Sequence, residues 1–178
     1  MRFARSLGII ALALTAAALS PRAVGADDLH HDVLSTIAAF KETDPGLRQF
    51  FDGAAGYAVF PSIAKGAIGI GGAHGDGELL VGGNALGKTA MTQVTIGLQL
   101  GGQEYSEIVF FENATTLDAF KKQQFEFSAQ VSAVAVKAGA SANAKYRDGV
   151  AVFTMAKGGL MFEASVGGQK FSYDAYKK

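Results

Sequence analysis

The stretch Gly56–Leu80, GYAVFPSIAKGAIGIGGAHGDGELL, decides the fold class of this 178-residue chain. It places seven glycines among two short apolar runs that are too rich in β-forming residues for a helix. Glycine weakens a regular strand, so this density implies close backbone packing, bulges or strong curvature. We expect a first strand that ends at Pro61, a second that begins at Gly66, and a turn at 75–77.

The residues before this stretch have helical rather than alternating spacing. Apolar residues recur every three or four positions over 28–40, which predicts an amphipathic helix. Asp44 is expected to cap a short second helix that has Pro45 in its first turn. The apolar residues at helical spacing are Leu29, Val33, Ile37 and Phe40, with Leu34 beside them, and the expected buried side of the second helix is Leu47, Phe50 and Phe51.

After the opening stretch the apolar pattern has a period of two, which is typical of strands. One helix interrupts this pattern, capped by Thr115 or Thr116 and continuing to Phe125. A tight hairpin turn is expected at 148–149, where Asp precedes Gly. The expected strands are 93–100, 108–111, 134–144, 150–155, 160–166 and 169–173.

Several short strands separated by glycine-rich turns favour an antiparallel sheet that curls toward a barrel. Together with the helical spacing near the N-terminus, they predict an α+β fold. In this fold the N-terminal helices pack on a curved, barrel-like antiparallel β-sheet of glycine-rich hairpins. We expect residues 27–178 to form a single domain with a sizeable core.

Residues 1–26 have the architecture of a secretory signal peptide. Arg2 and Arg5 precede an apolar core over 7–19, and small residues over 24–26 offer a cleavage site. A membrane anchor is the alternative, but an apolar run this short does not span a bilayer comfortably. The chain has no cysteine, which excludes disulfides, thiol chemistry and a lipoprotein attachment site. We therefore expect an exported protein, periplasmic or secreted.

The charge balance limits the classes of partner. Residues 27–178 contain 13 basic and 16 acidic residues, a formal charge of −3. Binding to nucleic-acid phosphates is driven by clustered positive charge, so no nucleic-acid partner is expected. Contact with a membrane would depend on a local patch or an apolar surface.

The segment 82–89 matches the phosphate-binding P-loop pattern, with Gly82, Gly87, Lys88 and Thr89 at required positions. A P-loop needs a helix that starts at its lysine, because the helix N-terminal amides hold the phosphates. The residues that follow alternate as in a strand, and the pattern shows no parallel βαβ unit. We interpret the match as a chance one within a glycine-rich turn, and expect no nucleotide partner.

No combination of residues indicates catalysis or a metal site. His30 and His31 are adjacent on an expected helix and point about 100° apart, so they cannot share a metal ion unaided. His74 lies in a glycine-rich segment without a nucleophile or base to pair with. We expect no enzyme activity, no catalytic residue, no metal and no cofactor.

Small basic clusters are the candidates for binding. Lys145 and Arg147 flank Tyr146 directly before the 148–149 turn, and Lys65 is expected beside another glycine turn. A basic residue near an anionic membrane contributes about 1 kcal/mol, and a tyrosine ring suits the headgroup region. The alternative is that these charges serve solubility alone. We predict lipid binding by Lys65, Lys145, Tyr146 and Arg147, with the last three facing a headgroup layer.

The chain resembles the SYLF domain, a lipid-binding module found from bacteria to yeast, plants and animals. The most specific part of the resemblance is 56–61, GYAVFP, followed by Lys65-Gly66 and Gly71-Gly72. The segment 94–103, VTIGLQLGGQ, looks like the second glycine strand of the family. A closing hairpin is matched by 157–161 and 167–168, so the resemblance covers nearly all of residues 27–178.

The resemblance implies a non-enzymatic module that binds membrane lipid, phosphoinositides in eukaryotic relatives, with actin binding in some. Actin is not expected as a partner of an exported bacterial protein. We therefore predict a lipid-binding protein of the cell envelope that contacts anionic phospholipid through a surface patch or an apolar groove under the first helix. The alternative is a structural or protein-interaction module of the periplasm without a lipid ligand.

Overall fold

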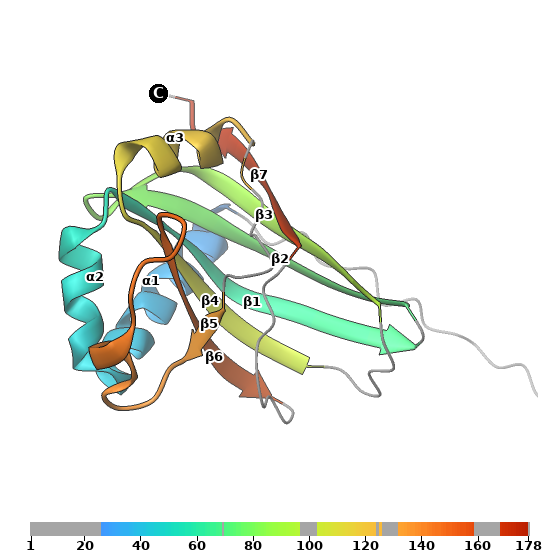
Figure 1. Ribbon diagram of the computed structural model, residues 1–178. Coiled ribbons are helices and arrows are strands. Elements are labelled where there is room, and N and C mark those ends of the chain that lie inside the picture. The colour runs from blue at the N-terminus through green and yellow to red at the C-terminus, as the bar shows by residue number, and fades with distance from the viewer. Residues whose placement is uncertain are drawn as a thin grey trace, which may run out of the picture.

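Figure 1 shows the computed structural model, which describes residues 26–68, 70–96, 103–123, 125, 132–158 and 168–177. The first two helices pack on a twisted β-sheet, and a third helix lies near the last strand. The helical elements are α1 (Ala26–Thr43), the 3-10 turn η1 (Pro45–Leu47), α2 (Arg48–Gly53), α3 (Ala114–Lys121) and the 3-10 turn η2 (Ala140–Asn143).

One sheet contains all the strands of the described residues. They are β1 (Gly56–Ile68), β2 (Ile70–Val81), β3 (Asn84–Ile96), β4 (Gln103–Phe111), β5 (Ala133–Ala135), β6 (Val150–Gly158) and β7 (Gln169–Ala175). Their order is β5-β6-β4-β1-β2-β3-β7, and neighbours are antiparallel except for the parallel pair of β5 and β6. The predicted α+β class, with helices packed on a curved and mostly antiparallel sheet, is confirmed.

One face of the sheet, the helix face, is covered by α1 and α2. Val33 and Phe40 of α1 and Phe50 of α2 are buried there against Phe110 of β4 and Phe153 of β6. The ring centroids of Phe50 and Phe153 lie 4.9 Å apart in an edge-to-face arrangement, a geometry that aromatic pairs favour. The apolar residues predicted at helical spacing over 28–40 are therefore the ones that α1 buries against the sheet.

The opposite face, the α3 face, buries a second aromatic cluster. The Phe120 ring of α3 lies 4.7 Å from Phe111 of β4 and 5.3 Å from Phe171 of β7, measured between ring centroids. Phe171 is also 5.7 Å from Phe60 of β1. Because β4 and β7 are four positions apart in the sheet order, these contacts mean that the sheet curls around the cluster. Among the described strands the curl leaves an open sheet, with β5 and β7 at its edges.

Asp44 is the predicted cap, but of the 3-10 turn η1 between the two helices; α2 itself begins at Arg48, without a side-chain cap. The Asp44 carboxylate accepts hydrogen bonds from the backbone N–H groups of Gly46, at 3.1 Å, and Ser141, at 2.7 Å. Burial alone would raise the pKa of Asp44, but the hydrogen bonds from Ser141 and Gly46 outweigh it and lower the pKa below its ordinary value. The cap therefore also fastens η2 to the N-terminal helices.

The glycine-rich hairpin is longer than the sequence pattern predicts. β1 continues through Pro61 to Ile68, and β2 runs straight through 75–77, so the expected break and the expected turn are both wrong. Pro61 is accommodated at an irregularity of β1, where the pairing with both neighbours shifts register. A Cβ atom at Gly77 would overlap the carbonyl oxygen of Val59 and lie 2.8 Å from Phe60 Cδ1. The glycine at 77 thus serves close strand packing, not a turn.

Three other expectations are corrected. The predicted strand 134–144 is limited to β5, and η2 replaces its second half, where Ser141 is bound by Asp44. Helix α3 is capped by Asn113 instead of a threonine, because Asn113 Oδ1 accepts from the Thr116 N–H at 3.0 Å. This helix ends at Lys121, and Phe125 packs against the core beyond it. The expected strand residues 97–100 and 160–166 lie outside the described residues.

Two buried polar side chains, from β4 and β7, meet on the α3 face of the sheet. Glu107 of β4 is fully buried, and its Oε2 accepts a hydrogen bond from Gln169 Nε2 of β7 at 3.1 Å. The other carboxyl oxygen of Glu107 and the hydroxyl of Thr154 on β6 are buried and have no hydrogen-bond partner among the described residues. Burial raises the pKa of Glu107 to about 8, although the bond from Gln169 opposes this shift. Glu107 is therefore largely protonated at neutral pH.

Candidate functional site

Lys145 and Arg147 lie at the end of the sheet where β6 begins. They precede a two-residue turn at Asp148 and Gly149, whose φ angles are 51° and 78°, as expected for the predicted tight turn. The Arg147 N–H donates to the Val150 carbonyl at 2.8 Å, and the Val150 N–H donates back at 3.0 Å. The turn therefore holds Arg147 beside the first residue of β6, and the side chains of both cations are exposed.

These two cations line one hollow of about 280 Å³ beside β5 and the start of β6. We call it the cationic hollow and define it by Lys145, Arg147, Asn143 and Ser132. No carboxylate is among its described lining residues. Within the described part of the chain, neither Lys145 nor Arg147 forms an ion pair. Both charges are thus available to an external anion, and Asn143 and Ser132 add neutral hydrogen-bonding groups.

Tyr146 packs toward α2 and, with Lys145 and Glu112, also lines a second hollow. Its ring packs against Phe50 of α2, with centroids 5.5 Å apart, and its hydroxyl oxygen is buried. Burial, followed by the negative charge of Glu112, raises the pKa of Tyr146. The expectation that all three residues of 145–147 face outward is therefore corrected in part: Tyr146 is half-buried and anchors the segment to α2, whereas the two cations are exposed.

Lys65 lies far from this hollow. It is a residue of β1, paired with Ala73 of β2 and Gln103 of β4, and it is only 7% exposed. Burial lowers the pKa of its ammonium group. The cationic hollow adjoins Val150, which pairs with Phe111 at the opposite end of β4. The structure thus does not bring Lys65 together with Lys145 and Arg147, and Lys65 is in a strand instead of a turn.

The P-loop match has no P-loop geometry. Gly82 and Gly83 form the turn between β2 and β3 with φ angles of 55° and 82°, and Lys88 and Thr89 lie inside β3. The Thr89 hydroxyl donates to the Ser172 carbonyl of β7 at 2.7 Å. The strand predicted after Lys88 is confirmed, and no helix N-terminus stands at Lys88 to hold a phosphate.

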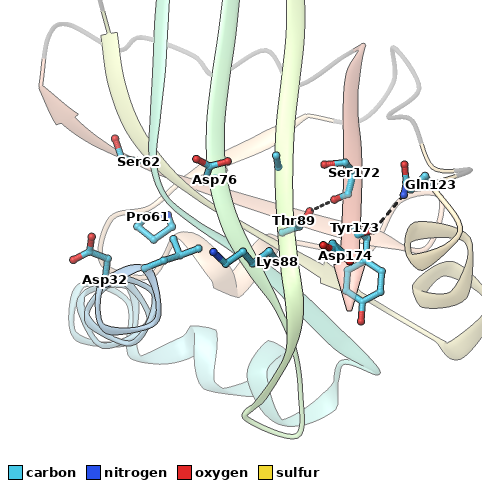
Figure 2. Close-up of a pocket in the computed structure, with 12 residues that line it drawn as sticks. Asp32, Pro61, Ser62, Asp76, Lys88, Thr89, Gln123, Ser172, Tyr173 and Asp174 are labelled. Carbon is cyan, nitrogen blue, oxygen red and sulfur yellow. Dashed lines mark hydrogen bonds between the residues drawn. The ribbon is translucent and has the colours of Figure 1, made fainter. Parts of the chain in front are cut away.

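A larger groove runs beside the N-terminal half of α1, where an apolar groove was the expected alternative to a surface patch; its lining residues were not predicted, and they include charged side chains. We call it the α1 groove; it encloses about 790 Å³ over β2, β3 and β7 (Figure 2). Its charged lining residues are Lys88 and the three carboxylates Asp32, Asp76 and Asp174. These residues come from four different elements, and sequence spacing alone does not bring them together. Such a volume is within the range of small-molecule sites.

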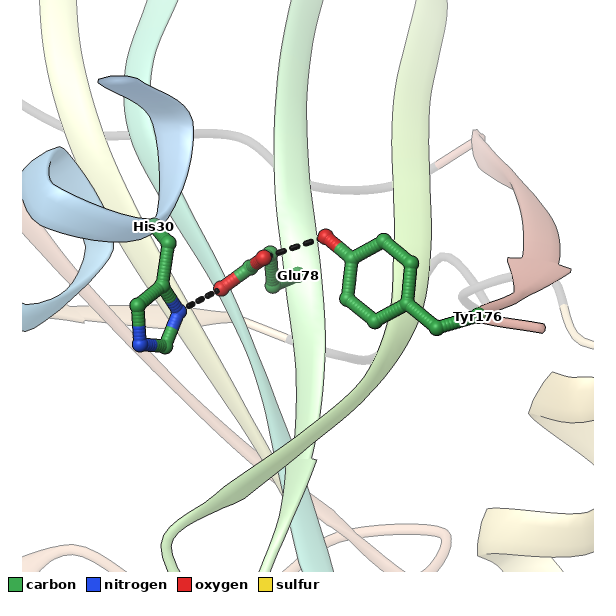
Figure 3. Close-up of polar contacts among 3 residues, drawn as sticks. All are labelled: His30, Glu78 and Tyr176. Atoms are coloured by element: carbon green, nitrogen blue, oxygen red, sulfur yellow. Dashed lines mark hydrogen bonds and ion pairs between the residues drawn. The ribbon is translucent and has the colours of Figure 1, made fainter. Parts of the chain in front are cut away.

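A hydrogen-bonded group next to the groove ties both ends of the described chain to the sheet (Figure 3). Glu78 of β2, which is 1% exposed, accepts from His30 Nδ1 of α1 at 2.7 Å and from the hydroxyl of Tyr176. Burial first, and then the hydrogen bond to Glu78, raise the pKa of Tyr176. Because a buried carboxylate is costly unless it is paired, these contacts fix α1 on β2.

The described residues contain no group of three or more His, Cys, Asp or Glu side chains arranged to hold a metal ion. None of the helices among them is long and apolar enough to cross a membrane. Two hollows of the described residues are candidate binding surfaces, the cationic hollow and the α1 groove. They lie toward opposite edges of the sheet, which are formed by β5 and β7.

Comparisons with known proteins agree with the sequence resemblance. The model of the Ysc84 family, described as Las17-binding protein actin regulator, matches residues 92–177. Beta cell expansion factor A of Aeromonas veronii is 34% identical over 141 residues, which cover 78% of this chain and 52% of that protein. The chain thus spans about half the length of this curated relative. The range matched by the family model contains Lys145 and Arg147, whereas Lys65 and Lys88 precede it.

Proposed function

Because the chain belongs to the Ysc84 or SYLF family, we propose that it binds anionic phospholipid through its cationic hollow. The family is associated with lipid and actin binding in general, and it is a family of binding modules, not of enzymes. The observation that carries the proposal is the placement of Lys145 and Arg147 in one hollow that has no carboxylate among its described lining residues.

The electrostatics of the hollow support this choice of ligand. The segment 27–178 has a net negative charge, so its attraction to an anionic surface has to be local. Two exposed cations directly before one turn meet this requirement, since each contributes about 1 kcal/mol near an anionic membrane. The Asp148–Gly149 turn and the Tyr146–Phe50 contact hold the segment in place, which lowers the entropy lost on binding.

The proposal places this binding in the cell envelope, for a protein that is exported by residues 1–26 and acts without catalysis or a cofactor. Support for export comes from the signal-like sequence of that segment. Actin is not among the proposed partners, because an exported bacterial protein does not meet it. The competing proposal is a protein-interaction module of the periplasm without a lipid ligand.

Vesicle co-sedimentation tests the hollow. Replacing Lys145 and Arg147 together by alanine is expected to weaken binding to anionic vesicles by about 2 kcal/mol, roughly 30-fold, from the two lost charges. Binding by wild type is expected to weaken as added salt shortens the Debye length to about 8 Å at physiological strength. The fold should persist, because exposed turn positions usually change the free energy of unfolding by less than about 0.5 kcal/mol.

The matched control replaces Lys157 and Lys170, which removes the same charge from exposed positions outside the hollow. This variant should bind anionic vesicles like wild type. Equal losses in both double variants would show a general charge effect and contradict the hollow as the site. Salt-insensitive binding that is equal on neutral vesicles would favour an apolar surface, and no binding to any vesicle would favour the protein-interaction proposal.

A further inference from the structure

The charged side chains that line the α1 groove do not pair with one another among the described residues. Lys88 of β3 stands between Glu78 of β2 and Asp174 of β7 in the strand register. Directly opposed residues of neighbouring strands have Cβ atoms about 5 Å apart. Yet within the described residues Lys88 forms no ion pair. Glu78 is engaged by His30 and Tyr176 instead.

The direction of the Lys88 side chain explains this separation. Figure 2 shows Lys88 extending across the sheet toward α1, away from Asp174. Its amino group therefore lies within the groove and not over the β7 edge. Asp174 and Asp32 are likewise without an ion pair in the described part of the chain, and Asp76 makes only a long contact with His74, at 3.7 Å.

The groove thus presents one cation and three carboxylates around a partly apolar lining. The apolar part comes from Leu29 of α1, Pro61 of β1 and Ala90 of β3. A simple anion would meet three like charges, and a simple cation would meet Lys88. A ligand that carries both charges on a short linker satisfies both, because its anion pairs with Lys88 and its ammonium group pairs with the carboxylates.

We propose that the α1 groove binds the phosphoethanolamine headgroup of an aminophospholipid. The phosphate is placed at Lys88, and the primary ammonium group, which donates three hydrogen bonds, is placed at Asp76 and Asp32. The volume of about 790 Å³ exceeds the size of the headgroup, and Leu29, Pro61 and Ala90 line the remaining space for the apolar chain. This site is separate from the cationic hollow and does not depend on it.

Calorimetric titration with free O-phosphoethanolamine tests the headgroup part of this site. We expect saturable binding that is at least fivefold tighter than the binding of ethanolamine or inorganic phosphate, because only the whole headgroup pairs with both charge types. Lys88→Met and Asp76→Asn should each weaken it at least fivefold. The control Lys170→Met removes a charge from an exposed β7 position outside the groove lining and should leave it unchanged.

Vesicles separate a lipid source from a soluble one. Phosphatidylcholine vesicles that contain phosphatidylethanolamine should bind wild type more tightly than vesicles without it, and Lys88→Met should abolish the difference. The Lys145→Ala and Arg147→Ala double variant should retain this difference. A failure of the α1 groove proposal is therefore distinguishable from a failure of the cationic hollow proposal. Free headgroup that binds no tighter than its two halves would overturn the proposal, as would enhancement by phosphatidylethanolamine that survives Lys88→Met.

Discussion

Replacing Gly77 by alanine is expected to destabilise the fold by about 3 kcal/mol, the upper part of the range for overpacked interior positions. The added Cβ would overlap the carbonyl oxygen of Val59 and lie 2.8 Å from Phe60 Cδ1. The carbonyl belongs to the β1 backbone and cannot rotate away, so β1 and β2 would have to separate. Urea unfolding measures the effect as a lower midpoint with an unchanged denaturant slope.

Gly72→Ala is the matched control on the same strand. A Cβ at Gly72 would lie 3.5 Å from the Gln93 carbonyl oxygen, an ordinary contact, and the position is exposed. Its stability should stay within about 0.5 kcal/mol of wild type. Similar losses of stability in the two variants would mean that alanine weakens β2 at any glycine position. Close packing at Gly77 would then not be the cause.

The free energy of unfolding is expected to fall as pH rises from about 5 to about 8, because of Glu107. Burial raises the folded pKa of this carboxyl to about 8, against an ordinary value of 4.5. Between these values the folded state holds a proton that the unfolded state has released, so unfolding loses a proton and rising pH favours it. The contribution of one such group is at most about 1.4 kcal/mol per pH unit. It is fully present below pH 4.5 and lost as pH passes 8.

Glu107→Gln should remove this slope and make the protein more stable than wild type above pH 8. A glutamine keeps the shape and still accepts from Gln169. Its amide group also has hydrogens to offer to the Thr154 oxygen, which has no partner among the described residues. The control is Glu104→Gln on the same strand, an exposed position that should retain the wild-type slope. Denaturant unfolding at several pH values gives both curves. Identical slopes in wild type and Glu107→Gln would show that another group carries the pH dependence.

The elements that depend on local pattern were predictable from the sequence. The spacing over 28–40, the Asp44 cap and the 148–149 turn each follow from a few neighbouring residues, and the structure has all three. The turn expected at 75–77 was wrong because Gly77 is required by the Val59 carbonyl, which belongs to a different strand. Likewise, the alternation over 134–144 resembles a strand, but Asp44 binds Ser141 from 97 positions away in the sequence.

For the candidate sites too, the features set by neighbouring residues were predictable, and the features set by distant residues were not. Lys145 and Arg147 are exposed because they adjoin a turn, and a turn is a local feature of the sequence. The burial of Tyr146 depends on Phe50 of α2, and the burial of Lys65 depends on its place in a central strand. The α1 groove required the register of β2, β3 and β7, since only the register places Lys88 beside Glu78 and Asp174.

The central claim is that the cationic hollow faces the membrane, and a fluorescent reporter tests it most directly. The chain has no cysteine, so Asn143→Cys places a single environment-sensitive dye at the hollow. Ala156→Cys places the same dye at an exposed position on β6, about 20 Å along the strand from Val150 at 3.3 Å per residue. With anionic vesicles at low salt, we expect a blue shift at residue 143 that high salt reverses, and no shift at residue 156. Vesicle binding with a shift only at residue 156, or with no shift at residue 143, would contradict the proposed orientation.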